Sequence, residues 1–273
     1  MKKRIVIKIG TKVITDNNGS IDTKVVGSIV SQVSEMVQKG MDVLIVSSGA
    51  IGAGMGLLGM TKRSKNIAWL QSMASIGQVQ LMDIYNRFFK KYNYHTGQIL
   101  LTQEDFDNRQ RYLNIKYTIN TLLEHRVIPI INENDTISTE EIKCGDNDRL
   151  SALVADLIGA DMLIILTAVD GLLDECGRLV ENVNVINKKT RSLIKTEKTD
   201  CGTGGMITKI DAADFATKAG IKCYFANGKK DGKILKIINK QKGDYTFFEA
   251  QQKNVKAKKD GSVLVQRLKV RSF

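Results

Sequence analysis

The sequence predicts an α/β protein with a three-layer αβα sandwich, in which helices cover both faces of a mostly parallel central sheet. Short apolar runs of strand length alternate along the chain with longer segments whose apolar residues recur every three or four positions. The run 162–167 is apolar at nearly every position, as expected for a central parallel strand buried on both faces. Right-handed connections between such strands place the helices against the sheet.

The first predicted strand, 3–9, is a β-prone run that ends at the turn Gly10-Thr11-Lys12. Lys8 lies inside this run. A lysine in a buried strand is costly unless an anion pairs with it, although a lysine that faces outward is the more common case. The next segment, 22–39, has helical spacing and ends at Gly40.

The second predicted strand, 43–46, leads into a segment of small residues, 47–54, which we expect to be a loop whose amides approach an anion. The pattern Gly-x-Gly-x-x-Gly follows at 54–59. It is typical of dinucleotide-binding proteins, but its glycines start several residues after the strand and no acidic residue follows before Asp83. The sequence also lacks the P-loop motif, so ATP binding would need another device.

The middle of the chain continues the alternation. A long helix is predicted over 67–91, and core packing explains its apolar face. A strand at 97–101, a polar loop at 102–111 and a helix at 112–125 follow, and they return the chain to a buried strand at 127–131.

Two polar clusters then stand close together in the sequence, at 132–135 and 146–148. The first follows a strand, at the strand end where open α/β sheets bind ligands. The second precedes helical spacing over 150–158, so Asp146 is expected to cap that helix. The segment 136–143 between them is expected to form a hairpin or a flap over the substrate. These amides and acids suggest one site for a polar substrate rather than a metal.

The last motif is the glycine-rich turn Gly-Thr-Gly-Gly-Met-Ile-Thr-Lys at 202–209, which feeds a predicted helix. Free amides and the helix dipole favour a phosphate there, although a flexible turn without function is the alternative. Lys209 would lie in the first turns of this helix. A strand is predicted at 221–226, and the final segment, 240–273, is basic.

The composition excludes several other classes. No apolar stretch approaches the roughly 20 residues needed to span a bilayer and no signal-peptide layout is present, so a cytoplasmic protein without membrane contact is expected. The four cysteines form no Cys-x-x-Cys pair, which argues against a zinc ribbon or a disulfide framework. The net charge of +12 is compatible with a nucleic-acid surface, a solvated basic surface or a site for anionic ligands. Because the basic residues are spread along the chain without a stacking motif, no nucleic-acid partner is expected.

Five motifs, in one order, resemble the glutamate 5-kinases of the amino-acid kinase family. They are Lys8-Ile9-Gly10-Thr11, Ser48-Gly49-Ala50, Ile131-Asn132-Glu133-Asn134-Asp135 with Gly145-Asp146-Asn147-Asp148, Thr167 with Gly171-Leu172, and Gly202 to Lys209. Ala168 and Leu173 depart from the family pattern, which leaves Thr167 and the backbone for contact with the nucleotide.

The resemblance implies the amino-acid kinase fold and the transfer of the ATP γ-phosphoryl group to the side-chain carboxylate of L-glutamate, the first step of proline biosynthesis. The implied catalytic residues are Lys8, Asp148 and Lys209. The implied glutamate-binding residues are Ser48, Asn132, Asp135 and Asn147, with Asp135 on the α-ammonium group. The amides of Gly10 and Gly49 would contact the transferred phosphate. The implied ATP-binding residues are Lys8, Thr167, Ala168, Thr203, Gly204, Gly205, Met206, Ile207, Thr208 and Lys209.

Magnesium is expected on the ATP phosphates, and the sequence names no protein ligand for it. A carboxylate acceptor is already deprotonated near neutral pH, so no general base is needed and the acceleration must come from positioning and charge neutralisation. We expect residues 1–240 to form the amino-acid kinase domain and 241–273 to be a short basic extension of it, without the PUA domain that many bacterial relatives carry. The resemblance also implies feedback inhibition by proline and a homo-oligomer.

Two other interpretations stay open. One is a different acylphosphate kinase of the same fold, which the choice of acceptor would reveal. The other is an amino-acid or nucleotide sensor that retains the pocket without catalysis, which the absence of ADP release would reveal.

Overall fold

The computed structural model describes residues 2–16, 19–137, 147–194 and 205–252. Its strands are β1 (Arg4–Ile9), β2 (Asp42–Ser47), β3 (Thr96–Leu101), β4 (Ile128–Glu133), β5 (Met162–Thr167), β6 (Asn182–Val183), β7 (Lys222–Asn227) and β8 (Tyr245–Phe248). Its helices are α1 (Thr11–Ile14), α2 (Thr23–Gln38), α3 (Ala50–Leu57), α4 (Ile67–Lys90), α5 (Gln103–Asp107), α6 (Arg109–Glu124), α7 (Asn147–Leu157), α8 (Lys188–Ser192), α9 (Met206–Lys218) and α10 (Lys233–Ile238).

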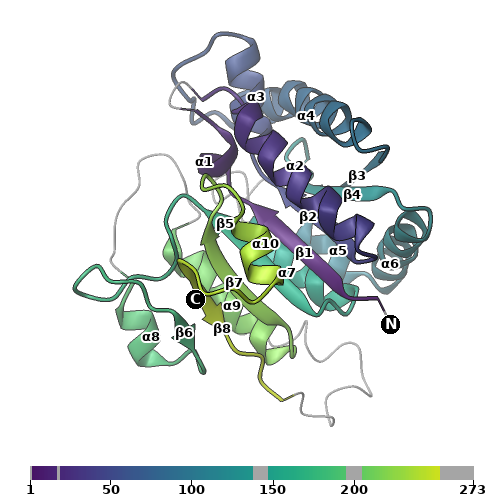
Figure 1. Ribbon diagram of the computed structural model, residues 1–273. Coiled ribbons are helices and arrows are strands. Elements are labelled where there is room, and N and C mark those ends of the chain that lie inside the picture. The colour runs from purple at the N-terminus through teal and green to yellow at the C-terminus, as the bar shows by residue number, and fades with distance from the viewer. Residues whose placement is uncertain (1, 17–18, 138–146, 195–204, 253–273) are drawn as a thin grey trace.

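The strands form one eight-stranded sheet in the order β3-β4-β2-β1-β5-β7-β8-β6 (Figure 1). Neighbours from β3 to β7 pair in parallel, whereas β8 runs antiparallel to β7. From β1 the chain first forms one side of the sheet, where β4 lies between β2 and the edge strand β3, and then forms the other side through β5 and β7. The carboxyl end of β1 therefore lies where the strand order reverses, which is where open α/β sheets bind their ligands.

Two apolar cores lie on opposite faces of the sheet, so the prediction of three layers is confirmed. Helices α5, α6, α7 and α9 cover one face, and helices α1, α2, α4 and α10 cover the other. Figure 1 shows α2 and α10 in front of the sheet and α7 and α9 behind it. Central strands such as β4 and β5 are buried along their whole length, which explains their nearly continuous apolar sequence.

Local signals account for most helix boundaries. The side chain of Asp22 accepts hydrogen bonds from the amides of Lys24 and Val25 and so caps α2. Asn66 caps the long helix α4 in the same way, through the amide of Trp69. Gly40 follows α2 with a φ of 83°, a left-handed conformation that suits glycine at a helix end.

Two predicted loops are wrong. The small-residue segment 47–54 was expected to be a loop, but β2 extends through Ser47 and α3 begins at Ala50. Gly54 within α3 allows a close crossing with α4: an added Cβ would lie 2.0 Å from the carbonyl oxygen of Met73. The polar segment 102–111 contains α5, which begins with a capping box formed by Thr102 and Asp105.

The final segment contributes more to the fold than its composition indicated. Strand β8 pairs with β7 and β6, so residues 245–248 belong to the central sheet. Most of the hairpin or flap expected over 136–143, namely residues 138–143, lies outside the described residues, as do the Asp146 cap and the loop residues Thr203 and Gly204. In the described ranges, every helix falls short of the length or the apolar character that crossing a bilayer requires.

Candidate active site

The candidate site lies at the carboxyl ends of β1, β2, β4 and β5, and its centre is Asp148 in the first turn of α7. Its Oδ1 lies 2.5 Å from Nζ of Lys8, and its Oδ2 lies 3.1 Å from Nζ of Lys209. The hydroxyl of Thr208 also donates a hydrogen bond to Oδ2, at 2.8 Å. The exposed fractions of Lys8, Asp148 and Lys209 are only 4%, 1% and 8%. Three elements that are distant in sequence therefore place one carboxylate between two lysines in the interior.

The alternation of side chains along β1 explains why Lys8 faces inward. Ile7 and Ile9 pack in the core on the α2 side, whereas Val6 packs in the core beneath α7 and α9. Lys8 shares the orientation of Val6 and so points towards the two helices that carry Asp148 and Lys209. The lysine is buried with an anion as its partner.

Electrostatics keep this carboxylate ionised. Burial by itself would raise the pKa of Asp148, but the charges of Lys8 and Lys209 and the hydrogen bond from Thr208 outweigh it, so its pKa lies below the usual value. The two lysines and the single carboxylate together carry one excess positive charge. A buried excess charge of this sign favours an anionic ligand.

A second cluster, made of amides and a hydroxyl, adjoins Asp148. Nδ2 of Asn147 lies 2.9 Å from Oδ1 of Asn132, 2.9 Å from Oγ of Ser48 and 3.4 Å from the carbonyl oxygen of Ser47. Three of the four residues predicted to bind glutamate are thus joined by hydrogen bonds. Asp135, the fourth, is half-buried in the turn that follows β4.

One contact in this cluster has no counterpart in the sequence prediction. Nδ2 of Asn132 donates to Oε1 of Gln78 at 2.8 Å, and Gln78 lies in α4, a helix that we interpreted as core packing alone. Gln78 has no sequence signal of its own, because it stands within a broad apolar helix face and its partner is 54 residues away.

The residues predicted to contact the transferred phosphate lie beside this cluster. Gly49 precedes α3 with a φ of 105°, which favours glycine, and an added Cβ would lie 3.0 Å from Cδ1 of Ile14. The first amides of α3 lack partners within the helix and so can serve an anion. The amide of Gly10, in contrast, donates to the carbonyl oxygen of Leu166 at 3.3 Å.

The residues predicted to bind nucleotide lie at the ends of β5 and β7 and at the start of α9. Thr167 ends β5, and its carbonyl oxygen accepts from the amide of Gly228. Ala168 is exposed, and its carbonyl oxygen accepts from Nδ2 of Asn227. Gly205 precedes α9, whose first residues are Met206 and the largely exposed Ile207. The amides at this helix end are suited to phosphate oxygens.

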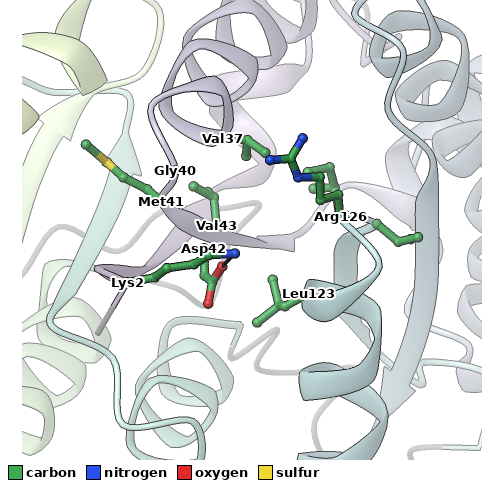
Figure 2. Close-up of a pocket in the computed structure, with 10 residues that line it drawn as sticks. Lys2, Val37, Gly40, Met41, Asp42, Val43, Leu123 and Arg126 are labelled. Carbon is green, nitrogen blue, oxygen red and sulfur yellow. Dashed lines mark ion pairs between the residues drawn. The ribbon is translucent and has the colours of Figure 1, made fainter.

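A separate pocket lies at the end of the strands opposite to the candidate site, at the amino ends of β1, β2 and β4. Figure 2 shows Val37, Met41, Leu123 and Arg126 around it, with the side chains of Lys2 and Asp42 close together. These two side chains form an ion pair at 3.7 Å. None of the predicted catalytic or substrate-binding residues lines this pocket, so it does not belong to the candidate site.

The donor set at the candidate site suits ATP better than a protein-bound metal. The carboxylate of Asp148 is occupied by two lysines and Thr208, so it is not available as a metal ligand. In the described ranges, no three histidine, cysteine or carboxylate side chains converge to hold a metal ion. A magnesium ion that is carried by ATP would be compatible with this donor set.

Comparison with known sequences shows which proteins this chain is similar to. The model of the Amino acid kinase family matches residues 3–227. A glutamate 5-kinase from Caldanaerobacter subterraneus subsp. tengcongensis is 46% identical over 251 residues, which is 90% of this chain and 68% of the relative. A glutamate 5-kinase from Clostridium acetobutylicum is 43% identical over 242 residues, which is 86% of this chain and 91% of the relative.

Comparison with solved structures shows the same fold at lower identity. The UMP kinase from Ureaplasma parvum superposes with a TM-score of 0.59 and 18% identity, covering 91% of this chain and 100% of that one. The carbamate kinase from Giardia lamblia bound to AMP-PNP gives a TM-score of 0.63 and 16% identity, covering 91% and 98%. Family model, relatives and fold agree with one another. The chain therefore belongs to the amino acid kinase family and, within it, to the glutamate 5-kinases.

Proposed function

We propose that this chain transfers the γ-phosphoryl group of MgATP to the side-chain carboxylate of L-glutamate and so forms L-glutamyl 5-phosphate, the first step of proline biosynthesis. The observation that carries the proposal is the pair of buried lysines on Asp148, directly beside the cluster of Ser48, Asn132 and Asn147. The relatives of the chain, which are glutamate 5-kinases, support the choice of glutamate.

The chemistry requires two anions to meet in line. A carboxylate acceptor and a triphosphate repel each other in water, so a cationic, partly dehydrated site lowers the barrier by compensating charge. Lys8 and Lys209 supply two positive charges in a low-dielectric setting, and Asp148 fixes both ammonium groups in place before the substrates bind.

The amide cluster is suited to an amino-acid substrate. Oδ1 of Asn147 is buried and accepts no hydrogen bond from the described residues, so it can accept one from an α-ammonium group. Ser48 accepts from Asn147, which leaves its hydroxyl proton for a carboxylate oxygen. We assign the α-ammonium group to Asn147 and Asp135 together.

On the nucleotide side, we assign the phosphates to Lys8, Lys209 and the start of α9, and the remainder of ATP to Thr167 and the backbone at Ala168. Magnesium bound with ATP would supply positive charge that offsets the negative charge of the phosphates. Feedback inhibition by proline and assembly into a homo-oligomer remain predictions that rest on the resemblance alone.

The test is acceptor-dependent ADP release from MgATP, with hydroxylamine present to trap an acylphosphate as its hydroxamate. L-glutamate, L-aspartate and N-acetyl-L-glutamate are compared side by side, and reactions without magnesium serve as the control. Hydroxamate with L-glutamate alone is the expected result. Release of ADP with a different acceptor would mean that the substrate is that acceptor and that the proposed mechanism of transfer still holds. No release of ADP with any acceptor would overturn the proposal in favour of a sensor.

A further inference from the structure

A chain of amide side chains runs from the protein surface into the candidate site: Gln98, Gln78, Asn132 and Asn147. Nε2 of Gln78 donates to Oε1 of Gln98 at 3.1 Å, and Nδ2 of Asn132 donates to Oε1 of Gln78 at 2.8 Å. Nδ2 of Asn147 then donates to Oδ1 of Asn132 at 2.9 Å. Gln98 is exposed on β3, whereas Gln78 is only 8% exposed. Each amide therefore orients the next one inward.

Backbone groups fix the direction of this chain. The amide of Glu133 donates to Oδ1 of Asn132 at 2.9 Å, and the carbonyl oxygen of Ser47 accepts from Nδ2 of Asn147 at 3.4 Å. A backbone N–H can only donate and a carbonyl can only accept, so neither asparagine amide can be turned over without losing a bond. Asn132 thus presents its Nδ2 to Gln78, and the Gln78 side chain must present its oxygen in return.

This direction decides what the inner end of the chain offers to a ligand. Because Nδ2 of Asn147 faces three acceptors, its Oδ1 is the atom left over, and it is buried without a partner among the described residues. If Asn132 rotated, Nδ2 of Asn147 would lose one of its three acceptors, and its Oδ1 would be held less firmly in this position. The position of Asn147 Oδ1 therefore depends in part on the contact between Asn132 and Gln78.

We infer that Gln78 is a positioning residue for the acceptor amino acid, which acts by holding Asn132 and through it Asn147 in the orientation that receives a protonated amine. The inference rests on the proposed function and adds a specificity residue from α4, which carries none of the predicted site residues. It concerns the acceptor and not the nucleotide, because the hydrogen-bond chain ends at Asn147 and Ser48.

The test is a steady-state comparison of wild type with Gln78→Met, which keeps the length of the side chain and removes its oxygen. Leaving the buried Nδ2 of Asn132 without an acceptor should raise the KM for L-glutamate about tenfold, while the KM for MgATP stays unchanged. Gln80→Met is the matched control, because Gln80 lies in the same helix and forms no hydrogen bond with the amides in the chain. It should leave both constants unchanged.

A second variant, Gln78→Glu, keeps an oxygen for Asn132 but loses the donor to Gln98 and adds a negative charge. It should raise the KM for L-glutamate by about threefold, less than Gln78→Met, because the bond that is lost is the part-buried one to Gln98 and the buried one from Asn132 is kept. An unchanged KM for L-glutamate in both variants, or an equal rise in both Michaelis constants, would overturn the inference.

Folding of each variant is checked by circular dichroism and thermal unfolding. If Gln78→Met does not fold, Gln78→Glu decides alone: a rise confined to L-glutamate supports the role, and unchanged or equally raised constants overturn it. Wild type is assayed first for hydroxamate with L-glutamate. Absence of hydroxamate there would mean failure of the proposed function, whereas wild-type activity with an unaltered Gln78→Met KM would mean failure of this inference alone.

Discussion

Asp148 is the residue on which the charge arrangement depends. It pairs with Lys8 of the first strand and with Lys209 of α9, which is 61 residues further along the chain. Because each lysine keeps its own place in a strand or a helix, removing one of them leaves Asp148 with the other as its partner. A single lysine substitution should therefore impair the chemistry more than the fold.

Lys209→Ala tests this at the residue scale. Loss of one preorganised charge contact should lower turnover about a hundredfold, which corresponds to a rise of about 3 kcal/mol in the activation free energy. The control is Lys218→Ala at the end of the same helix, where the lysine is exposed and pairs with Asp214. Turnover is measured with saturating MgATP and L-glutamate, and folding is measured by circular dichroism. Turnover of the Lys209→Ala variant close to wild type would refute the catalytic assignment.

At the scale of elements, the crossing of α3 and α4 sets the position of the part of the candidate site that we assign to L-glutamate. A Cβ on Gly77 would lie 1.8 Å from the carbonyl oxygen of Ala50, and one on Gly54 would lie 2.0 Å from that of Met73. Both contacts are with backbone, which cannot rotate away as a flexible side chain could. The two helices therefore approach as closely as they do only because both positions are glycine.

Gly77→Ala should consequently destabilise the protein although alanine is the better helix former. Overpacking against backbone is expected to cost about 3 kcal/mol, which outweighs the gain of about 1 kcal/mol in helix propensity. Urea unfolding measures the difference, with Ser75→Ala on the exposed side of the same helix as the control. Unfolding midpoints that coincide for wild type and Gly77→Ala would show that the helices can separate without cost.

At the scale of the whole molecule, the buried charges link stability to pH. The folded-state pKa of Asp148 is depressed, since the charges of Lys8 and Lys209 outweigh the effect of burial. A depressed pKa stabilises the fold at pH values above the unfolded-state pKa, and this stabilisation is lost as the pH falls through the folded-state value.

Asp148→Asn makes this link measurable. The difference in free energy of unfolding between wild type and the variant should be largest near neutral pH and should shrink below about pH 4, close to the pKa of an unfolded aspartate. The exposed ion pair of Asp83 with Arg87 provides the control, because Asp83→Asn should change stability little at any pH. Urea unfolding across this pH range is the measurement, and a difference that does not vary with pH would contradict the argument.

The sequence by itself determined the order of the six main parallel strands and of the longer helices between them, because apolar periodicity is local information that burial on a sheet then uses. It also determined the family, since five motifs kept their order. The two wrong loops, 47–54 and 102–111, failed for a physical reason. Small residues in the first permit a helix crossing, which depends on a contact between distant segments. The second contains a capping box, Thr102 with Asp105, which is a local signal for a helix start that its polar composition outweighed in our prediction.

Only the tertiary structure decided which way Lys8 points, how far Asp148 lies from Lys8 and Lys209, and that Gln78 holds Asn132. Each of these contacts joins residues from different elements, and their placement follows from the pairing of β1 with its neighbours and the packing of α4, α7 and α9 on the sheet. Sequence spacing carries no measure of such distances, whereas burial makes most polar groups in the interior form hydrogen bonds with one another. The residues that carry the chemistry of the site can thus be named from the sequence, but the distances between them are set only when the sheet brings them together.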